Sequence, residues 1–170
     1  MTGRAARPLH AWRWLGLPAA AAAGATLLAG VPLQVAGLRL PEPVFAAVLA
    51  FAWPLIRPSI LAPFAVLASG LVLDFWWGSP LGLWAFSLLA IYVGALAARS
   101  LVVGQPTPVI FAWWLGLVVA AFTCAALLTM LGTATLLQPW PVVWQLVATL
   151  ALFPVATYLI DRYADEARRL

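Results

Sequence analysis

The chain has 170 residues, of which 65% are hydrophobic and only 8% are charged, and its formal net charge is +4. Soluble domains average about 45–50% apolar and about 25% charged residues, so this composition predicts an all-α integral membrane protein without a large domain outside the lipid. It excludes a soluble enzyme, a nucleic-acid-binding module and a disordered linker.

Proline and glycine interrupt the apolar sequence at five places that are typical of connections between helices. We therefore expect a bundle of six transmembrane helices, at residues 14–38, 42–57, 59–77, 80–98, 107–131 and 139–160. A span needs about 20 apolar residues, so the second segment could be either a short span or a re-entrant element. The expected organisation is a cytoplasmic N-terminus at 1–13, a membrane domain at 14–160 and a cytoplasmic tail at 161–170.

The arginines predict which side of the membrane each end of the bundle faces. All nine basic residues are Arg, and most stand singly between apolar runs. Six spans with a cytoplasmic N-terminus place eight of them inside and only Arg39 outside, which the positive-inside rule favours, so we expect both termini inside. Besides their effect on topology, we expect cytoplasmic contacts with a partner protein or with anionic headgroups at Arg57 and Arg99. At Arg168 and Arg169 in the tail, we expect a docking point for a cytoskeletal partner.

Prolines inside the expected spans predict kinks in the helices. They are Pro18, Pro32, Pro63 and Pro154. A proline frees a carbonyl one turn earlier, and in lipid a neighbouring group must satisfy that carbonyl. We therefore expect each of these positions to disturb the regular packing of its helix.

The sequence contains no recognisable catalytic or metal-binding constellation. Cys124 is the only cysteine and His10 the only histidine, so neither an intrachain disulfide nor a Cys/His metal cluster is possible. No nucleophile–base pair and no phosphate-binding loop is present. We expect a protein that is not an enzyme and that carries no cofactor.

One carboxylate, Asp74, lies well inside an apolar segment. A charged side chain in hydrocarbon costs about 2.5–3.5 kcal/mol on insertion scales, so Asp74 must face protein or water and needs hydrogen-bond donors. Helical spacing places Gly70 and Gly78 on the same face, at i−4 and i+4. Such a narrow face of small residues predicts the close approach of a second helix around the carboxylate.

The residues after Asp74 predict a tight hairpin between the third and fourth helices. Ser79 is typical of an N-cap residue and Pro80 of the first helical position. Asp74 could then accept hydrogen bonds from Ser79, from the backbone N–H groups that open the fourth helix, or from the Trp84 indole. Three roles stay open for it: locking the hairpin, contacting a partner or ligand, and relaying protons. The chain has no second buried ionisable group to support a relay.

The pattern Gly-Leu-x-x-Asp-x-x-x-Gly-Ser-Pro-Leu-Gly-Leu at residues 70–83 resembles the signature of MreD, the family of rod-shape-determining membrane proteins of bacteria. The chain length, the six expected spans and the Arg57-Pro58 pair before the pattern also resemble that family. The sequence departs from it at Trp84, a position where the family often holds a polar residue such as His.

The resemblance implies a non-catalytic scaffold in the bacterial inner membrane. MreD-like proteins act with the bitopic protein MreC and, directly or through it, with the actin-like MreB, the glycosyltransferase RodA and a class B penicillin-binding transpeptidase. Structural or partner contacts are then expected at Gly70, Asp74, Gly78, Ser79, Pro80, Gly82 and Trp84. The family is also similar in fold to the substrate-binding components of energy-coupling-factor transporters. Such a transport component is the alternative, although the chain offers few convergent polar groups for a ligand pocket.

Overall fold

Helices form nearly all of the chain that the computed structural model describes, which comprises residues 24, 26, 34–35, 38–39, 43–133 and 139–168. The helices are α2 (Phe45–Ile56), α3 (Ala62–Trp77), α4 (Leu83–Ala97), α5 (Arg99–Val102), α6 (Thr107–Thr133), α7 (Pro139–Leu150) and α8 (Phe153–Arg168). Five of the six expected segments are therefore helical, since α7 and α8 together occupy the last one.

The first expected span, at residues 14–38, lies largely outside the described residues. At its end, β1 (Gln34–Val35) pairs antiparallel with β2 (Leu38–Arg39). The expected helix therefore does not reach residue 38. The expected N-terminus at 1–13 also lies outside the described part of the chain.

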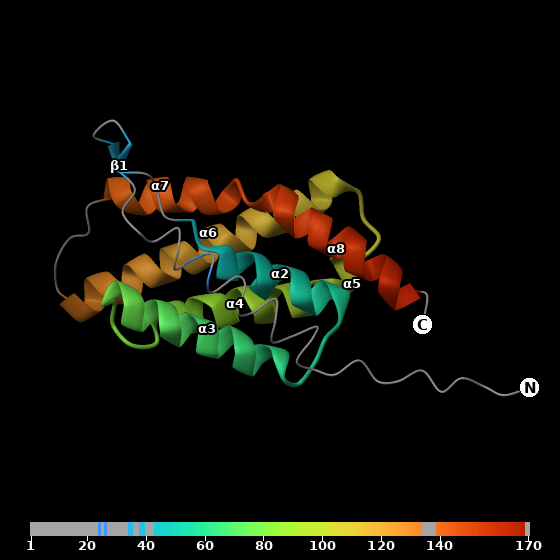
Figure 1. Ribbon diagram of the computed structural model, residues 1–170, viewed down its shortest axis with the longest axis horizontal. Helices are drawn as coiled ribbons and strands as arrows, with labels where there is room; N and C mark the ends of the chain where they lie inside the picture. The colour runs from blue at the N-terminus through green and yellow to red at the C-terminus, as the bar shows by residue number, and fades with distance from the viewer. Residues whose placement is uncertain are drawn as a thin grey trace, which may run out of the picture.

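The long helices run side by side and alternate in direction (Figure 1). Helix α4 lies at the centre of these contacts, against α2, α3 and α6, while α8 packs on α2 and α7 packs on α6. Because direction alternates, the turn between α3 and α4 lies at one end of the bundle. The end of α2 and the short helix α5 lie at the other end.

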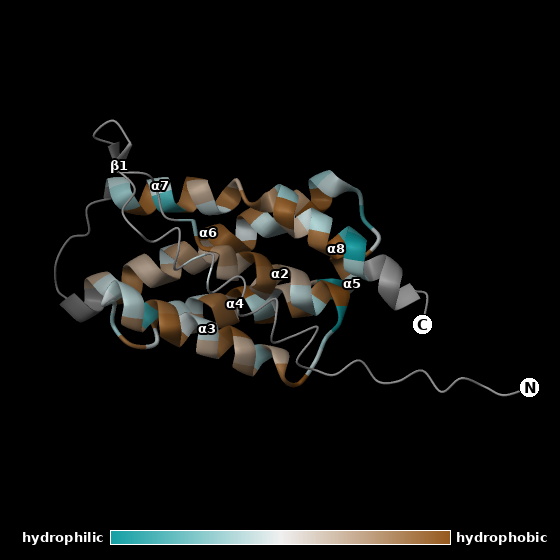
Figure 2. Cartoon of the chain, in the orientation of Figure 1, coloured by the Kyte–Doolittle hydropathy of each residue, from teal (hydrophilic) through white to brown (hydrophobic). Residues whose placement is uncertain are grey.

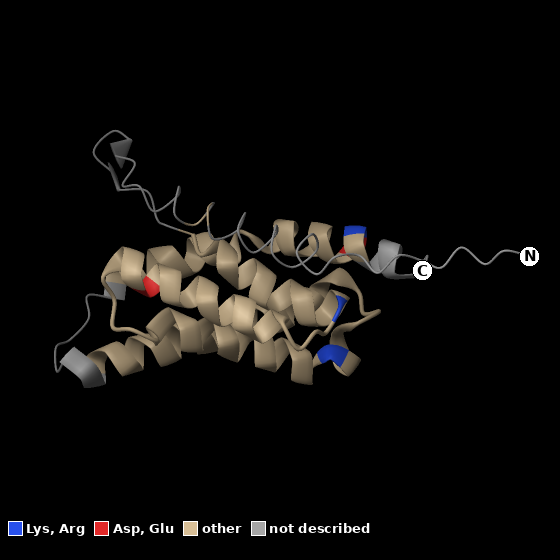
Figure 3. Cartoon of the chain, turned by 60° about the horizontal axis from the view of Figure 1, so that its bottom comes forward, with Lys and Arg blue, Asp and Glu red and all other residues tan. Residues whose placement is uncertain are grey.

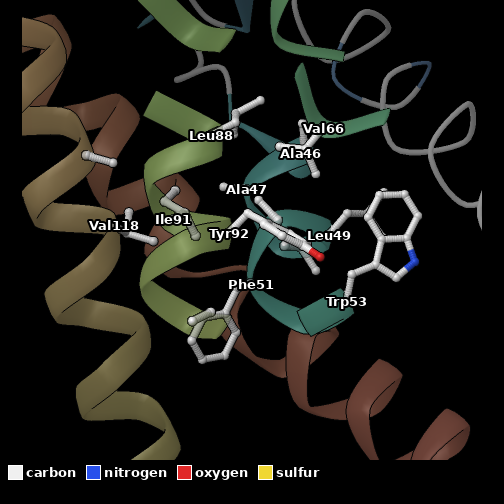
Figure 4. Packing of buried hydrophobic residues seen from close by; sticks show 14 of the residues in the cluster. Ala46, Ala47, Leu49, Phe51, Trp53, Val66, Leu88, Ile91, Tyr92 and Val118 are labelled. Atoms are coloured by element: carbon white, nitrogen blue, oxygen red, sulfur yellow. The ribbon is translucent and has the colours of Figure 1, made fainter. Parts of the chain in front are cut away.

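Helix α2 forms the core of the bundle. It contains no polar side chain, and all ten residues from Ala46 to Leu55 are buried. A helix that is apolar on every side is stable only when it is enclosed, and here α3, α4 and α8 enclose it. Figure 4 shows Phe51 of α2 near Ile91 of α4 and Val118 of α6.

The last expected span is interrupted between α7 and α8 by Pro154. This proline lacks an N–H group and cannot bond to the carbonyl of Leu150, four residues earlier. The indole of Trp114 donates to that carbonyl instead, at 3.3 Å. One residue before, the hydroxyl of Thr149 accepts the N–H of Val44 at 3.1 Å, where α2 begins. The expected kink is confirmed, and neighbouring helices satisfy the groups beside it.

The other expected proline kinks have different outcomes. Pro63 lies in the first turn of α3, where a proline is tolerated, so the expected kink at this position is wrong. Pro18 and Pro32 lie outside the described residues. Pro54, which is not among the expected kink positions, lies inside α2 near its end.

The outer surface of the bundle is apolar, and Figure 2 shows hydrophobic residues along all of its long helices. Two stretches, Thr107–Met130 and Trp140–Tyr163, are long and apolar enough to cross a membrane. Only 28% and 11% of their most apolar windows are buried, whereas the core helix of a soluble protein is mostly buried. The shorter helices α2, α3 and α4 are apolar as well.

Candidate functional site

The backbone of Asp74 ends helix α3. Its carbonyl accepts the N–H of Gly78, and also the N–H of Ser79 at 3.0 Å. Gly78 adopts the left-handed conformation, with φ 61°, which glycine enters without the steric cost that a Cβ would bring. The chain therefore leaves α3 sharply and turns back toward α4.

The side chain of Asp74 binds the other half of the same turn. Oδ1 accepts the Ser79 hydroxyl at 2.9 Å and the backbone N–H of Trp84 at 2.8 Å. Oδ2 accepts the backbone N–H of Gly82 at 2.8 Å. The side chain is fully buried, and all three of its donors come from the turn or the first turn of α4. The expected donors are thus present, with one exception.

That exception is Trp84, whose backbone N–H and not its indole donates to Asp74. The indole ring packs edge-on against Trp77, with centroids 5.1 Å apart, and against Phe122 of α6 at 5.4 Å. The departure from the polar residue of the MreD pattern therefore leaves the carboxylate satisfied. The Trp77 indole N–H is buried and has no hydrogen-bond partner, a feature that the sequence did not predict.

Asp74 also caps α4, although it belongs to the preceding helix. The N-cap residue of α4 is Gly82, which has no side chain to accept an orphan N–H. The Asp74 carboxylate accepts from Gly82 itself and from Trp84, the second helical residue, and its negative charge faces the positive end of the helix dipole. One residue thus ends α3 through its carbonyl and begins α4 through its carboxylate.

The expected helix start at Ser79 and Pro80 is wrong. Helix α4 begins at Leu83, and both residues lie in the turn that precedes it. The physical reason is Gly82, whose φ of 97° interrupts any helix that began at Pro80. Ser79 still has a capping-like function, because its hydroxyl binds the carboxylate that caps α4. The turn is therefore slightly longer than expected, but the hairpin of α3 and α4 is present.

Gly70 allows the two helices of the hairpin to touch. A Cβ atom on Gly70 would lie 2.8 Å from the carbonyl carbon of Trp84 and even closer to the backbone of Ala85. No side chain fits into this contact, which lies one helical turn before Asp74. The expectation that Gly78 also allows a second helix to approach is wrong, because a Cβ at this position would meet nothing within 4 Å. Gly78 serves the turn through its positive φ and not through close packing.

The buried hairpin can lock structure but offers little to an outside molecule. Both oxygens of Asp74 are already occupied by donors of its own chain, and the side chain has no exposed surface. Among the described residues no group of three His, Cys, Asp or Glu side chains is placed to hold a metal ion. Of the three roles open for Asp74, this geometry favours locking the hairpin.

Arg57, Arg99 and Arg162 lie at the opposite end of the bundle from Asp74, because they follow α2, begin α5 and belong to the second half of α8, respectively. Figure 3 shows the described basic residues gathered at one end of the bundle, whereas Asp74 belongs to the last turn of α3, at the other end. Arg57 follows the end of α2, and Arg99 begins α5, which contacts α2. Arg168 ends α8, and Arg169 lies outside the described residues. Arg57 and Arg99 thus lie at the same end of the bundle, as the alternation of spans predicts.

Comparisons with known proteins do not assign the chain to a family. A scan against protein-family models, a search of characterised proteins and a search of solved structures each give no match. The function must therefore be argued from the residues of the hairpin and from the surface of the bundle.

Proposed function

We propose that the chain is a non-catalytic scaffold of the MreD type in the bacterial cytoplasmic membrane. It would bind MreC and, with it, connect MreB and the wall-synthesis enzymes RodA and a class B transpeptidase during elongation. The observation that carries the proposal is the hairpin. Within the motif that resembles MreD, Asp74, Gly78, Ser79 and Gly82 each have a definite part in closing the turn, and Gly70 lets α3 and α4 pack closely.

The proposed membrane arrangement has six spans and both termini in the cytoplasm. It is supported by the alternating direction of α2, α3, α4, α6 and α7–α8, which puts Arg57, Arg99 and Arg162 at one end of the bundle. Helix α2 is only about 18 Å long and would not cross about 30 Å of hydrocarbon alone. Helices α3, α4 and α8 enclose it, so α2 itself would be surrounded mainly by protein and not by lipid.

The scaffold would act through rigid helices that present apolar surfaces within the bilayer. Large side chains on the outside of α3 are strongly exposed, including Phe64 at 66%, Phe75 at 84% and Trp76 at 55%. Association between helices in lipid depends on van der Waals packing and on a few interhelical hydrogen bonds, and both need fixed helix positions. Locking α3 to α4 fixes this surface without using any catalytic group.

The transport alternative has less support from the geometry. A substrate-binding component needs polar groups that converge on a ligand. Asp74, the strongest candidate for such a group, is buried and fully engaged by Ser79, Gly82 and Trp84. A ligand could reach it only by breaking the cap of α4.

The experiment that tests the proposal is affinity purification of the tagged protein from its native membrane in mild detergent, followed by mass spectrometry. We expect MreC to be recovered together with wall-synthesis enzymes. A tagged multi-span protein of similar abundance from the same membrane is the control for non-specific recovery. Recovery of an ATPase pair with a coupling membrane subunit would instead establish the transport alternative and contradict the scaffold.

A further inference from the structure

Arg99 is a cation whose side chain the fold holds in place without giving it an acceptor. It begins α5 between two anchored positions, Ala98 at 4% exposure and Val102 at 1%. Its side chain is partly buried, and its Nε atom is buried without a hydrogen-bond partner. No hydrogen bond or ion pair joins the guanidinium to any residue that the structure describes.

This arrangement is costly unless an anion other than the described residues of the chain supplies the acceptor. An arginine stays charged at all relevant pH values, and a buried donor without an acceptor costs about 1–3 kcal/mol or more when it is charged. The acidic side chains that the structure describes do not meet the need. Asp74 belongs to the last turn of α3, at the other end of the bundle from α5, and Asp161 is exposed on α8.

The surroundings of Arg99 are apolar and open. Leu101 is 58% exposed and Val103 is 51% exposed, directly after the arginine. Arg57 lies at the same end of the bundle, on the chain that leaves α2, and adds positive charge. A cation beside exposed apolar side chains matches a molecule with an anionic head and an apolar tail better than it matches a free anion.

We propose that Arg99 binds the phosphate of an anionic phospholipid, with Leu101 and Val103 against the upper part of the acyl chains. Guanidinium nitrogens form charge-assisted hydrogen bonds to phosphate oxygens, often in pairs. The site lies at the basic end of the bundle, away from the Asp74 hairpin. The proposal rests on the membrane location proposed above but not on the scaffold partners.

The test uses the full chain in nanodiscs of phosphatidylcholine with increasing fractions of phosphatidylglycerol. Bound phosphatidylglycerol is counted by native mass spectrometry, and the thermal midpoint is followed through tryptophan fluorescence. The variants are Arg99→Gln and Arg99→Lys, with Arg162→Gln as the control, because Arg162 is an exposed arginine whose guanidinium donates to the Tyr158 hydroxyl. We expect Arg99→Gln to lower the affinity for phosphatidylglycerol about fivefold and the control to change it less than twofold. Arg99→Lys, which keeps the charge but loses the planar fork, should lie between them.

Two results would overturn the proposal. Equal losses in Arg99→Gln and Arg162→Gln would mean that net charge alone attracts the lipid. If inorganic phosphate stabilised the detergent-solubilised protein as much as phosphatidylglycerol does, Arg99 would be a site for a free anion and not for a lipid. Failure to insert into nanodiscs would contradict the membrane location itself, whereas failure to recover MreC would leave the lipid site intact.

Discussion

Replacing Asp74 by leucine tests the hairpin most directly. The change removes the acceptor of three hydrogen bonds and leaves two backbone donors at the start of α4 without a partner, the part-buried N–H of Gly82 and the buried N–H of Trp84. Each orphaned donor costs about 1–3 kcal/mol, and the costs overlap because both belong to one network. We therefore expect Asp74→Leu to lower the free energy of unfolding by about 2–5 kcal/mol.

Asparagine at the same position should cost less. Its single carbonyl oxygen can still accept two donors, but its amide group then faces a third N–H or hydroxyl donor. The expected loss for Asp74→Asn is about 1–2 kcal/mol, close to the value of one hydrogen bond to a charged group. The matched control is Asp161→Asn, which changes an exposed carboxylate on α8.

The assay is thermal unfolding in a single detergent, followed by tryptophan fluorescence, with the recovery of MreC measured in parallel. We expect the order of stability to be wild type, then Asp74→Asn, then Asp74→Leu, with partner recovery falling in the same order. Equal midpoints for all three proteins would refute the capping function of Asp74. Unchanged stability combined with lost partner recovery would show that Asp74 contacts the partner directly.

Three further predictions concern the packing and the orientation of the bundle. Gly70→Ala should destabilise the protein by about 1–3 kcal/mol in the same unfolding assay, because the new methyl overlaps the α4 backbone, while Gly116→Ala, where a Cβ meets nothing within 4 Å, should change little. Trp114→Phe removes the donor to the carbonyl freed by the α7–α8 break and should cost about 1–3 kcal/mol by the same measurement. In a cysteine-free background, Leu81→Cys should react with an impermeant maleimide added to intact cells. Ser100→Cys should react only after the membrane is permeabilised, because it lies on the cytoplasmic side. Labelling of both cysteines from one side would contradict the alternating spans.

The buried carboxylate could be predicted because the sequence made it exceptional. Asp74 stands alone among apolar residues, and burial forces a polar group to find partners. The sequence therefore predicted a satisfied carboxylate near a hairpin, together with Ser79 and backbone N–H groups as donors. The structure contains these contacts.

The start of α4 could not be predicted from local signals. Ser79-Pro80 has the residue types of an N-cap and first helical position, but the actual cap is a side chain eight residues before Gly82. A cap supplied from a neighbouring helix leaves no local pattern, and the left-handed φ of Gly82 is not indicated by the Ser79-Pro80 pair. Of the alternative donors, the Trp84 indole is the one that does not bind Asp74, because the backbone N–H of Trp84 donates and the ring packs against Trp77 and Phe122.

At the break between α7 and α8 too, the sequence predicted the unpaired group but not its partner. Pro154 indicated a freed carbonyl, but nothing in the sequence indicated that Trp114, thirty-six residues before Leu150, would donate to it. The same holds for Thr149 and the N–H of Val44, which are 105 residues apart. Sequence predicts that a polar group needs a partner, whereas the identity of the partner depends on how the helices pack.

The charged groups at the two ends of the bundle differ in their hydrogen bonding, and this difference can be measured. The carboxylate of Asp74 is enclosed and satisfied within the chain, whereas the guanidinium of Arg99 has no acceptor among the described residues. Mutations at the hairpin should therefore act through the stability of the fold, and mutations of Arg99 through the surrounding lipid. Because the sites share no contact, the combined variant Asp74→Asn/Arg99→Gln should show the sum of the single effects within about 0.5 kcal/mol, at a fixed phosphatidylglycerol content. A larger coupling would mean that the lipid bound at one end alters the packing of α3 against α4 at the other, since α4 and α5 connect the two ends directly.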